Sequence, residues 1–131
     1  MDHSHIELKG LQITSLTRTA TGLCIAFSWA AIIKRMSGSQ ERTRWWQAGA
    51  LILENLASEP WLPAGPWRCI GGTIDENIYS YRDLIPIPFI SHGQIRCLLQ
   101  LEGQDRPLVV ESGTVRLELE GVARYIEHLR A

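Results

Sequence analysis

The apolar residues in the C-terminal half of the chain recur at every second position. Ile95, Cys97, Leu99 and Leu101 do so in residues 95–101, and Val115, Leu117 and Leu119 do so in residues 115–119. A period of two places alternate side chains on opposite faces of an extended strand. The polar stretch 103–107, which contains a glycine and a proline, separates the two runs. The pattern therefore predicts a pair of antiparallel strands with one buried and one wet face.

The N-terminal half contains three further apolar segments. Alternation in residues 6–16 slips by one place near Gly10, which predicts a strand with a bulge. Residues 23–33 alternate large apolar side chains with small ones, so this segment is predicted to be a strand covered on both faces. Because alanine favours helices, a helix over the same residues remains the alternative. Residues 45–56 resume the apolar pattern after a polar loop at 37–40, and the two segments form a plausible hairpin.

Prolines and glycines mark the remaining segments. Three prolines in residues 60–66 exclude regular structure and predict an ordered loop that holds Trp61 against the body. Residues 68–74 resemble a strand that is bent at Gly71 and Gly72. Residues 84–90 alternate proline with apolar residues, which permits only an edge strand or an extended connection.

The last segment changes period. After Gly121, the residues Val122, Tyr125, Ile126 and Leu129 recur at positions 0, 3, 4 and 7, which predicts a short amphipathic helix that caps the sheet. The expected fold is therefore a mostly β single domain over residues 1–131. Its predicted architecture is an antiparallel sandwich or partly open barrel with a short C-terminal helix.

Composition limits the classes of partner and the compartment. The 131 residues carry a formal net charge of −1, so the whole chain has no attraction to nucleic acid or to an anionic membrane, and neither is an expected partner. The cysteines at 24, 69 and 97 are odd in number and far apart, which excludes a closed disulfide framework and favours a reducing cytosol. An acid at position 2 without a following apolar run predicts no secretory signal. We expect a cytoplasmic protein.

No motif in the sequence specifies a catalytic site. The nucleophile elbow, phosphate-binding loop and zinc-protease motifs are absent from the sequence. Asp75, Glu76 and Asp83 form an acidic cluster, but nothing pairs them with a nucleophile, so a turn is the simpler interpretation. The spacing of His3 and His5 suits a metal only if a third ligand comes from elsewhere. We therefore expect no enzyme activity, no metal and no cofactor.

Arginines and aromatic rings gather around the loop at 37–40. Lys34, Arg35, Arg42 and Arg44 bracket this loop, and Trp45 and Trp46 follow at once. Adjacent tryptophans cannot both face inward on a flat strand, and Trp and Arg are enriched at protein interfaces. A protein partner is therefore the favoured hypothesis. The candidate binding residues are Arg42, Arg44, Trp45, Trp46, Trp61, Trp67, Tyr79 and Tyr81.

The order of these segments resembles a group of known bacterial domains. Residues 2–5 lead into a strand, residues 46–56 form a second apolar strand after a basic loop, and residues 113–121 end the sheet. This rhythm is similar to that of small β-rich bacterial domains of unknown function, some of which are predicted immunity proteins of polymorphic toxin systems. The resemblance implies a non-enzymatic protein that blocks a cognate toxin by surface complementarity.

Two other possibilities remain open at this point. The chain could instead be a small-molecule-binding β-barrel, with Trp29, Trp61, Trp67 and Tyr81 near an aromatic-lined pocket. Homo-oligomerisation, as a dimer, is compatible with either function because the apolar strands exceed what one small core needs.

Overall fold

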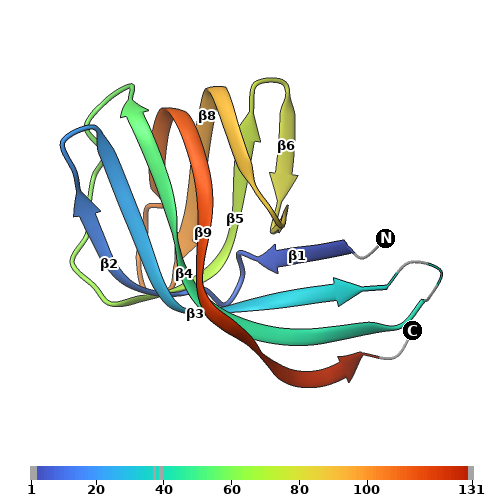
Figure 1. The fold of residues 1–131 in the computed structure, drawn as a ribbon. Helices are drawn as coiled ribbons and strands as arrows, with labels where there is room; N and C mark the ends of the chain where they lie inside the picture. Colours follow the sequence, from blue (N-terminus) through green and yellow to red (C-terminus); the bar gives the residue numbers. More distant parts are fainter. Residues whose placement is uncertain (1–2, 37, 39, 130–131) are drawn as a thin grey trace.

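The computed structural model describes residues 3–36, 38 and 40–129, and these residues form nine β-strands and no helix (Figure 1). All strand pairings are antiparallel. The strands are β1 (His3–Glu7), β2 (Gln12–Arg18), β3 (Gly22–Arg35), β4 (Arg42–Leu56), β5 (Trp67–Glu76), β6 (Tyr79–Arg82), β7 (Leu84–Pro86), β8 (Ile90–Leu101) and β9 (Leu108–Leu129).

Six of the strands form a ring in the order β2, β3, β4, β9, β8, β5 and back to β2. Strand β4 pairs with β3 on one side and with β9 on the other, at more than ten residue positions in each case. Strands β2 and β5, in contrast, pair through Gln12 with Arg68 and Ile13 with Trp67. The barrel therefore has long strand pairings around β4 and is closed by a short pairing between β2 and β5. The expected β fold with antiparallel strands is confirmed, and the ring corresponds to the predicted barrel.

Large aliphatic side chains fill the interior of the ring. They come from every strand of the barrel, because alternate residues of each strand point inward. Leu23, Ile25, Leu51, Leu53, Ile74 and Leu99 are among the residues whose side chains are fully buried. Leu8 and Leu11, from the turn between β1 and β2, join the same core. Burial of this apolar surface is the main contribution to the stability of the fold.

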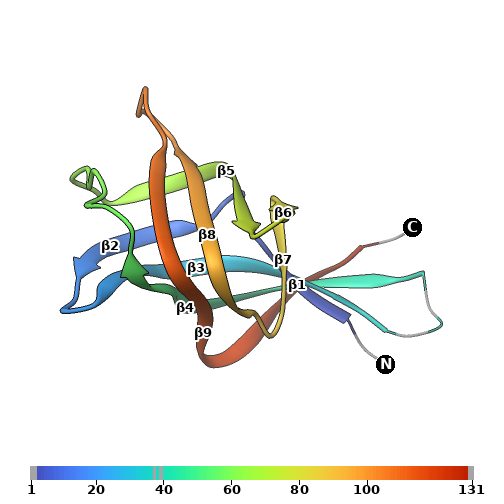
Figure 2. The same cartoon turned by 90° about the horizontal axis from the view of Figure 1, so that it is seen from above.

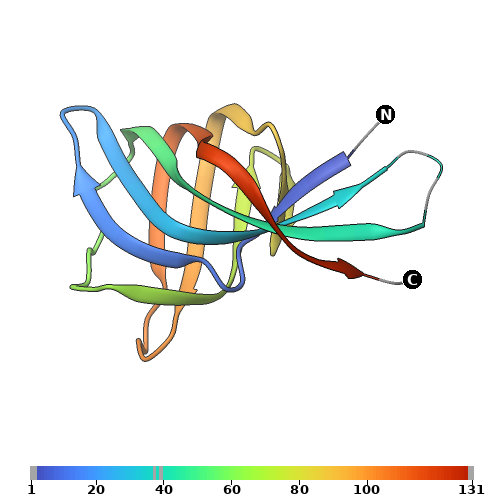
Figure 3. The same cartoon turned by 60° about the horizontal axis from the view of Figure 1, so that its bottom comes forward.

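Three long strands continue beyond the barrel into a second, flatter sheet, which lies on the right in Figures 1 and 2. We call this region the sheet extension. It consists of β1, residues 30–35 of β3, residues 42–47 of β4 and residues 121–129 of β9, in the order β1, β3, β4, β9. Figure 3 shows that it projects away from the barrel.

Several predicted elements are confirmed. Residues 23–33 lie in strand β3, which pairs with β4 as a hairpin, so the helical alternative is wrong. The predicted bend at the double glycine is a register shift between Cys69 and Gly71. Residues 84–90, predicted to be an edge strand or an extended connection, contribute the three-residue strand β7, which pairs with β1. The predicted bulge near Gly10 is a larger interruption, because the chain turns between β1 and β2 before both pair with β3.

The predicted C-terminal helix is wrong, because residues 122–129 belong to strand β9. Two register shifts explain the misleading period. One lies between the partners of Trp46 and Ala48, where β9 has three residues for one residue of β4. The other makes Ile126 an extra residue between Tyr125 and Glu127. Each extra residue breaks the period of two, so apolar positions in a bulged strand fall at spacings of three and four. Pairing with β4 therefore holds residues 122–129 as a strand, although their sequence pattern is typical of a helix.

The two buried thiols provide a test of the packed core. Burial raises the pKa of Cys69 to about 11 and that of Cys97 to about 12. Because the thiolate is the reactive form, both thiols should resist alkylation in the folded protein at pH 8. Iodoacetamide labelling followed by mass spectrometry should modify them only at the rate of unfolding, and at once in denaturant. Rapid labelling of either thiol in the native protein contradicts the burial.

The same shifts predict how stability depends on pH. Folding raises both thiol pKa values above the ordinary value of 9.0, so the folded state binds these protons more tightly than the unfolded chain. The contribution is therefore complete below pH 9 and is lost as the pH rises toward 11 and 12. Urea unfolding at pH 8, 10 and 11 should show a falling free energy of unfolding, and the decline should be smaller in a Cys69→Ala, Cys97→Ala variant, in which the raised pKa values of Cys24 and Tyr81 remain.

Candidate functional site

Cross-strand pairing divides the side chains of the sheet extension between two faces. Directly opposite residues share a face, and alternate residues along a strand do so too. Arg35 lies opposite both His3 and Arg42, and Ile33 lies opposite both His5 and Arg44. Lys34, in contrast, lies opposite Thr43. One face therefore collects arginines and histidines, and the other carries Lys34 with the ring of Trp45.

The first face forms a hollow with a volume of about 510 Å³, which we call the arginine groove. Six charged or titratable residues line it, namely His3, His5, Glu7, Arg35, Arg42 and Arg44. Three apolar residues complete the lining, namely Ile33, Leu84 and Leu129. The groove thus presents three guanidinium groups and two imidazoles against one lining carboxylate, beside a small apolar area.

Arg44 is held in place by acidic neighbours. Its Nε lies 3.5 Å from Oε1 of Glu7, and its Nη1 lies 3.9 Å from Oε2 of Glu127. The Nε atom is buried and makes no hydrogen bond within the described part of the chain, so the pair with Glu7 is a charge contact without hydrogen-bond geometry. Arg35 and Arg42 have no such ion pair among the residues that the structure describes.

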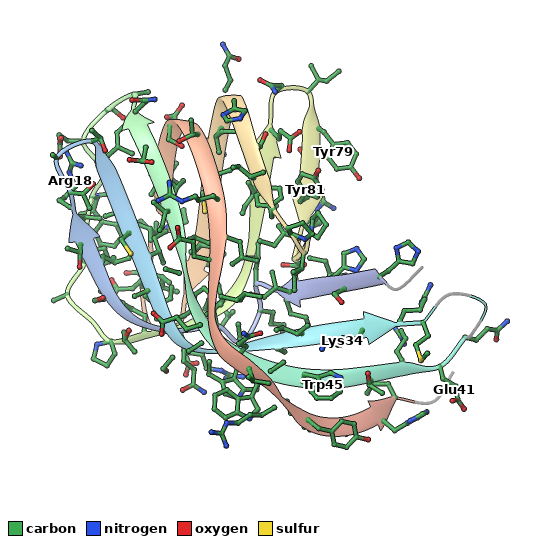
Figure 4. All side chains as sticks on the ribbon, in the orientation of Figure 1. Arg18, Lys34, Glu41, Trp45, Tyr79 and Tyr81 are labelled. Atoms are coloured by element: carbon green, nitrogen blue, oxygen red, sulfur yellow. The ribbon has the colours of Figure 1, made fainter. Side chains whose placement is uncertain are left out.

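The second face is built around Trp45. The Tyr125 ring packs edge-on against it with centroids 5.3 Å apart, and Lys34 Nζ lies 4.4 Å from the centroid of the Trp45 ring. The indole Nε1 donates a hydrogen bond of 2.8 Å to Thr43 Oγ1. Figure 4 shows Lys34 and Trp45 together on the sheet extension. The Trp45 ring therefore has packing and hydrogen-bond partners within the chain, and it lies on the face opposite the arginine groove.

Trp46 and Gln47 mark the junction between barrel and extension. The guanidinium of Arg124 lies 5.6 Å from the Trp46 ring centroid. The buried Gln47 amide donates to the carbonyl oxygens of Gly121 and Glu120, at 2.9 and 3.1 Å. Here residues 121–123 of β9 lie opposite Gln47 alone, and the Gln47 side chain bonds the carbonyl groups where this irregular stretch begins. Gln47 therefore fixes the bend at which β9 leaves the barrel.

The other four candidate residues lie elsewhere. Trp61 lies in the loop before β5 with Arg106 over its ring at 4.3 Å, and Trp67 belongs to the buried core. Tyr79 and Tyr81 pack against each other on β6 with ring centroids 4.6 Å apart. Figure 4 shows this pair apart from Lys34 and Trp45. Of the eight candidate residues, the structure brings only Arg42 and Arg44 together in the groove.

A second hollow lies at one end of the barrel, with a volume of about 570 Å³. Its charged lining residues are Asp75, Glu111 and Arg96, so two carboxylates face one guanidinium there. Asn77 in its wall is already bonded, since its Oδ1 accepts from Gln94 N at 2.9 Å. The arginine groove differs from this hollow in its excess of cations, which makes it the better candidate site.

Sequence reasoning missed the contribution of the N-terminal strand to the groove. His3 and His5 were considered only as metal ligands, and Arg35 only as part of a basic loop. Strand β1 brings the histidines beside Ile33 and Arg35 because it pairs with the end of β3. The spacing His3-x-His5 does place both on one face, but which strand lies beside them depends on tertiary pairing.

Within residues 3–36, 38 and 40–129, no group of three or more His, Cys, Asp or Glu side chains could hold a metal ion. The same part of the chain contains no helix long and apolar enough to cross a membrane. Comparisons of the sequence with protein-family models and with curated proteins, and of the fold with solved structures, found no match.

Proposed function

We propose that this chain is a non-enzymatic protein-binding domain that receives an acidic segment of its partner in the arginine groove. The observation that carries this proposal is the position of Arg35 directly opposite Arg42 on neighbouring strands, in the wall of the groove. Like charges directly opposite each other on a sheet oppose folding. A bound carboxylate relieves that repulsion, so the pair is better suited to a complex than to the free protein.

The charge balance of the groove supports an acidic ligand. Glu7 and Glu127 compensate the charge of Arg44, whereas Arg35 and Arg42 keep theirs within the described residues. Guanidinium groups bind carboxylates through paired hydrogen bonds, which gives both geometry and affinity. Two neighbouring arginines therefore suit a segment with two carboxylates close together.

The apolar lining favours a peptide over a small anion. Ile33, Leu84 and Leu129 lie in the same groove as the arginines. Interfaces typically combine a small apolar centre with a polar rim that contains arginine. A segment in which an apolar side chain lies beside acidic ones would use both parts of the lining.

The immunity role is one form of this proposal. A domain of that kind would place the groove against an acidic surface of its toxin and block the toxin without chemistry of its own. Inhibition of a candidate toxin at an equimolar ratio, and loss of this inhibition when Arg35 and Arg42 are replaced, tests that role.

The alternative function, a small-molecule-binding barrel, has less support. Its four rings occupy separate environments, with Trp61 beneath Arg106, Trp67 in the core and Tyr81 against Phe89 at 5.2 Å. Trp29 lines a separate, smaller hollow of about 300 Å³ near Glu7 and Gln12. Buried aliphatic side chains occupy the barrel interior, which is where a lipocalin-like ligand would lie.

Arg42→Gln separates a binding role from a structural one. We expect the affinity for the partner to fall about ten- to a hundredfold, since a hydrogen bond to a charged group contributes about 1.5–3 kcal/mol. The melting temperature should stay the same or rise slightly, because the repulsion with Arg35 is removed. Arg82→Gln, on the exposed strand β6, is the matched control and should change neither quantity.

The partner itself can be identified by photo-crosslinking in the source cells. A photoreactive residue in place of Leu84, which lines the groove and is 43% exposed, should give a discrete product whose crosslinked segment is rich in Asp and Glu. The same residue in place of Glu102, in the exposed β8–β9 turn, should not. Identical products from both positions, or a basic crosslinked segment, would contradict the proposal.

A further inference from the structure

Among the residues that the structure describes, the outer edge of β9 has no neighbouring strand in the sheet extension. Strand β8 pairs with β9 only as far as Arg116, and beyond Leu117 the described part of β9 pairs with β4 alone. This edge also carries apolar side chains that are open to solvent, since Val122 is 85% exposed, Tyr125 55% and Ile126 37%. An open edge with unpaired backbone groups is a template for another strand.

The bulge at Ile126 arranges the charges on this edge. Strict alternation would put Arg124 and Glu127 on opposite faces. The extra residue places them on the same face instead, because Arg124 lies opposite Trp46 and Glu127 opposite Arg44. The contacts of Arg124 with the Trp46 ring at 5.6 Å and of Glu127 with Arg44 at 3.9 Å agree with this arrangement.

We propose that this edge binds the same edge of a second copy of the chain, as an antiparallel pair of β9 strands. The two-fold axis lies between Tyr125 and Ile126. Arg124 of each copy then lies opposite Glu127 of the other and on the same face, which gives two symmetric ion pairs. In the same register Tyr125 lies opposite Ile126, and Val122 lies opposite Leu129. Charge complementarity and apolar contact therefore coincide in one register.

Neighbouring registers lack this complementarity. A two-fold axis at Arg124 would place arginine against arginine, and one at Glu127 would place glutamate against glutamate. A slip by one residue would also set side chains of opposite faces against each other. The sequence of the edge thus specifies a single self-pairing.

The dimer would extend the sheet without covering the groove. A two-fold axis of this kind runs perpendicular to the sheet, so both arginine grooves open on the same side. This inference concerns the edge of β9 and not the binding of an acidic segment, so either can fail without the other.

Charge exchange at Arg124 and Glu127 tests the proposal. Sedimentation equilibrium should detect a dimer of the wild-type chain, with a Kd raised at least about tenfold by Arg124→Glu or by Glu127→Arg. The double variant should restore the Kd to within about threefold of wild type, since it exchanges the partners of the same pairs. Arg82→Glu controls for the change in net charge, and circular dichroism confirms that each variant folds.

Disulfide trapping tests the register. Ala123 lies opposite His128 in the proposed pairing, so a chain with Cys24→Ala, Ala123→Cys and His128→Cys should form a crosslinked dimer under mild oxidation. Chains with only one of the two introduced cysteines should not become crosslinked, because identical positions lie five residues apart along the paired strands. A wild-type chain that stays monomeric up to millimolar concentration overturns the proposal, since the bulge then protects the edge. A dimer that is indifferent to the charge exchange also overturns it.

Discussion

Replacing Gly49 with alanine is expected to destabilise the protein by about 1–3 kcal/mol, which is the usual range for overpacking with backbone displacement. Gly49 lies in β4 between Phe27 of β3 and Leu119 of β9. A Cβ atom there would overlap the carbonyl oxygen of Glu118 and lie 3.1 Å from Cζ of Phe27. Since the obstacle is backbone, the two strands must separate to admit a methyl group.

The sign of this effect makes it a sharp test. At a position that tolerates alanine, the exchange from glycine usually stabilises a protein by about 0.4–1 kcal/mol through the unfolded chain. Urea unfolding should instead give a midpoint about 1–2 M lower for Gly49→Ala. Gly113→Ala is the control, because its nearest contact is the Asn55 Cβ at 3.2 Å and no backbone overlap arises. An unchanged midpoint for Gly49→Ala would show that β4 and β9 are not this close.

Replacing Gln47 with leucine is expected to lower the free energy of unfolding by about 1–3 kcal/mol, because two part-buried hydrogen bonds are lost and each contributes about 0.5–1.5 kcal/mol. The amide of Gln47 donates to the carbonyl oxygens of both Glu120 and Gly121. Leucine has a similar volume, so packing should change little and the lost hydrogen bonds should dominate. The bend that directs β9 into the sheet extension depends on these two bonds.

Hydrogen exchange can localise this effect. Amides of residues 121–129 should lose more protection in Gln47→Leu than amides of residues 112–116, which lie between β8 and β4. Binding of an acidic partner should weaken too, because Leu129 and Glu127 lie at the groove or beside it. Gln100→Leu, at an exposed position of β8, is the matched control and should leave stability within about 0.5 kcal/mol. Equal loss of protection across β9 would contradict a local role.

The strands were largely predictable because each one carries a local pattern. Residues 95–101 and 115–119 alternate strictly, and their pairing follows from the short polar connection. The end of β9 was mistaken for a helix because bulges opposite Trp46 and at Ile126 interrupt the alternation. A bulge depends on the neighbouring strand, so a sequence window around it resembles a different period.

The candidate site was predictable only in part. Arg42 and Arg44 stood out because they follow the basic loop, and both line the groove. Trp45 and Trp46 were grouped with them, but successive residues of a strand point to opposite faces, so Trp45 lies behind the groove with Lys34 and Tyr125. Trp61, Trp67, Tyr79 and Tyr81 have the composition of an interface, yet they lie in other parts of the fold.

The sequence by itself determined that this chain forms antiparallel β-strands with an aliphatic core, because side-chain alternation is a local property of the backbone. Only the tertiary structure decided which strands close the barrel and which continue into the sheet extension. The groove exists because β1, β3, β4 and β9 lie side by side there, which brings His3, Arg35 and Arg42 into one row across the sheet. These residues are far apart along the chain, and long-range hydrogen bonds between strands carry no signal in a local sequence pattern.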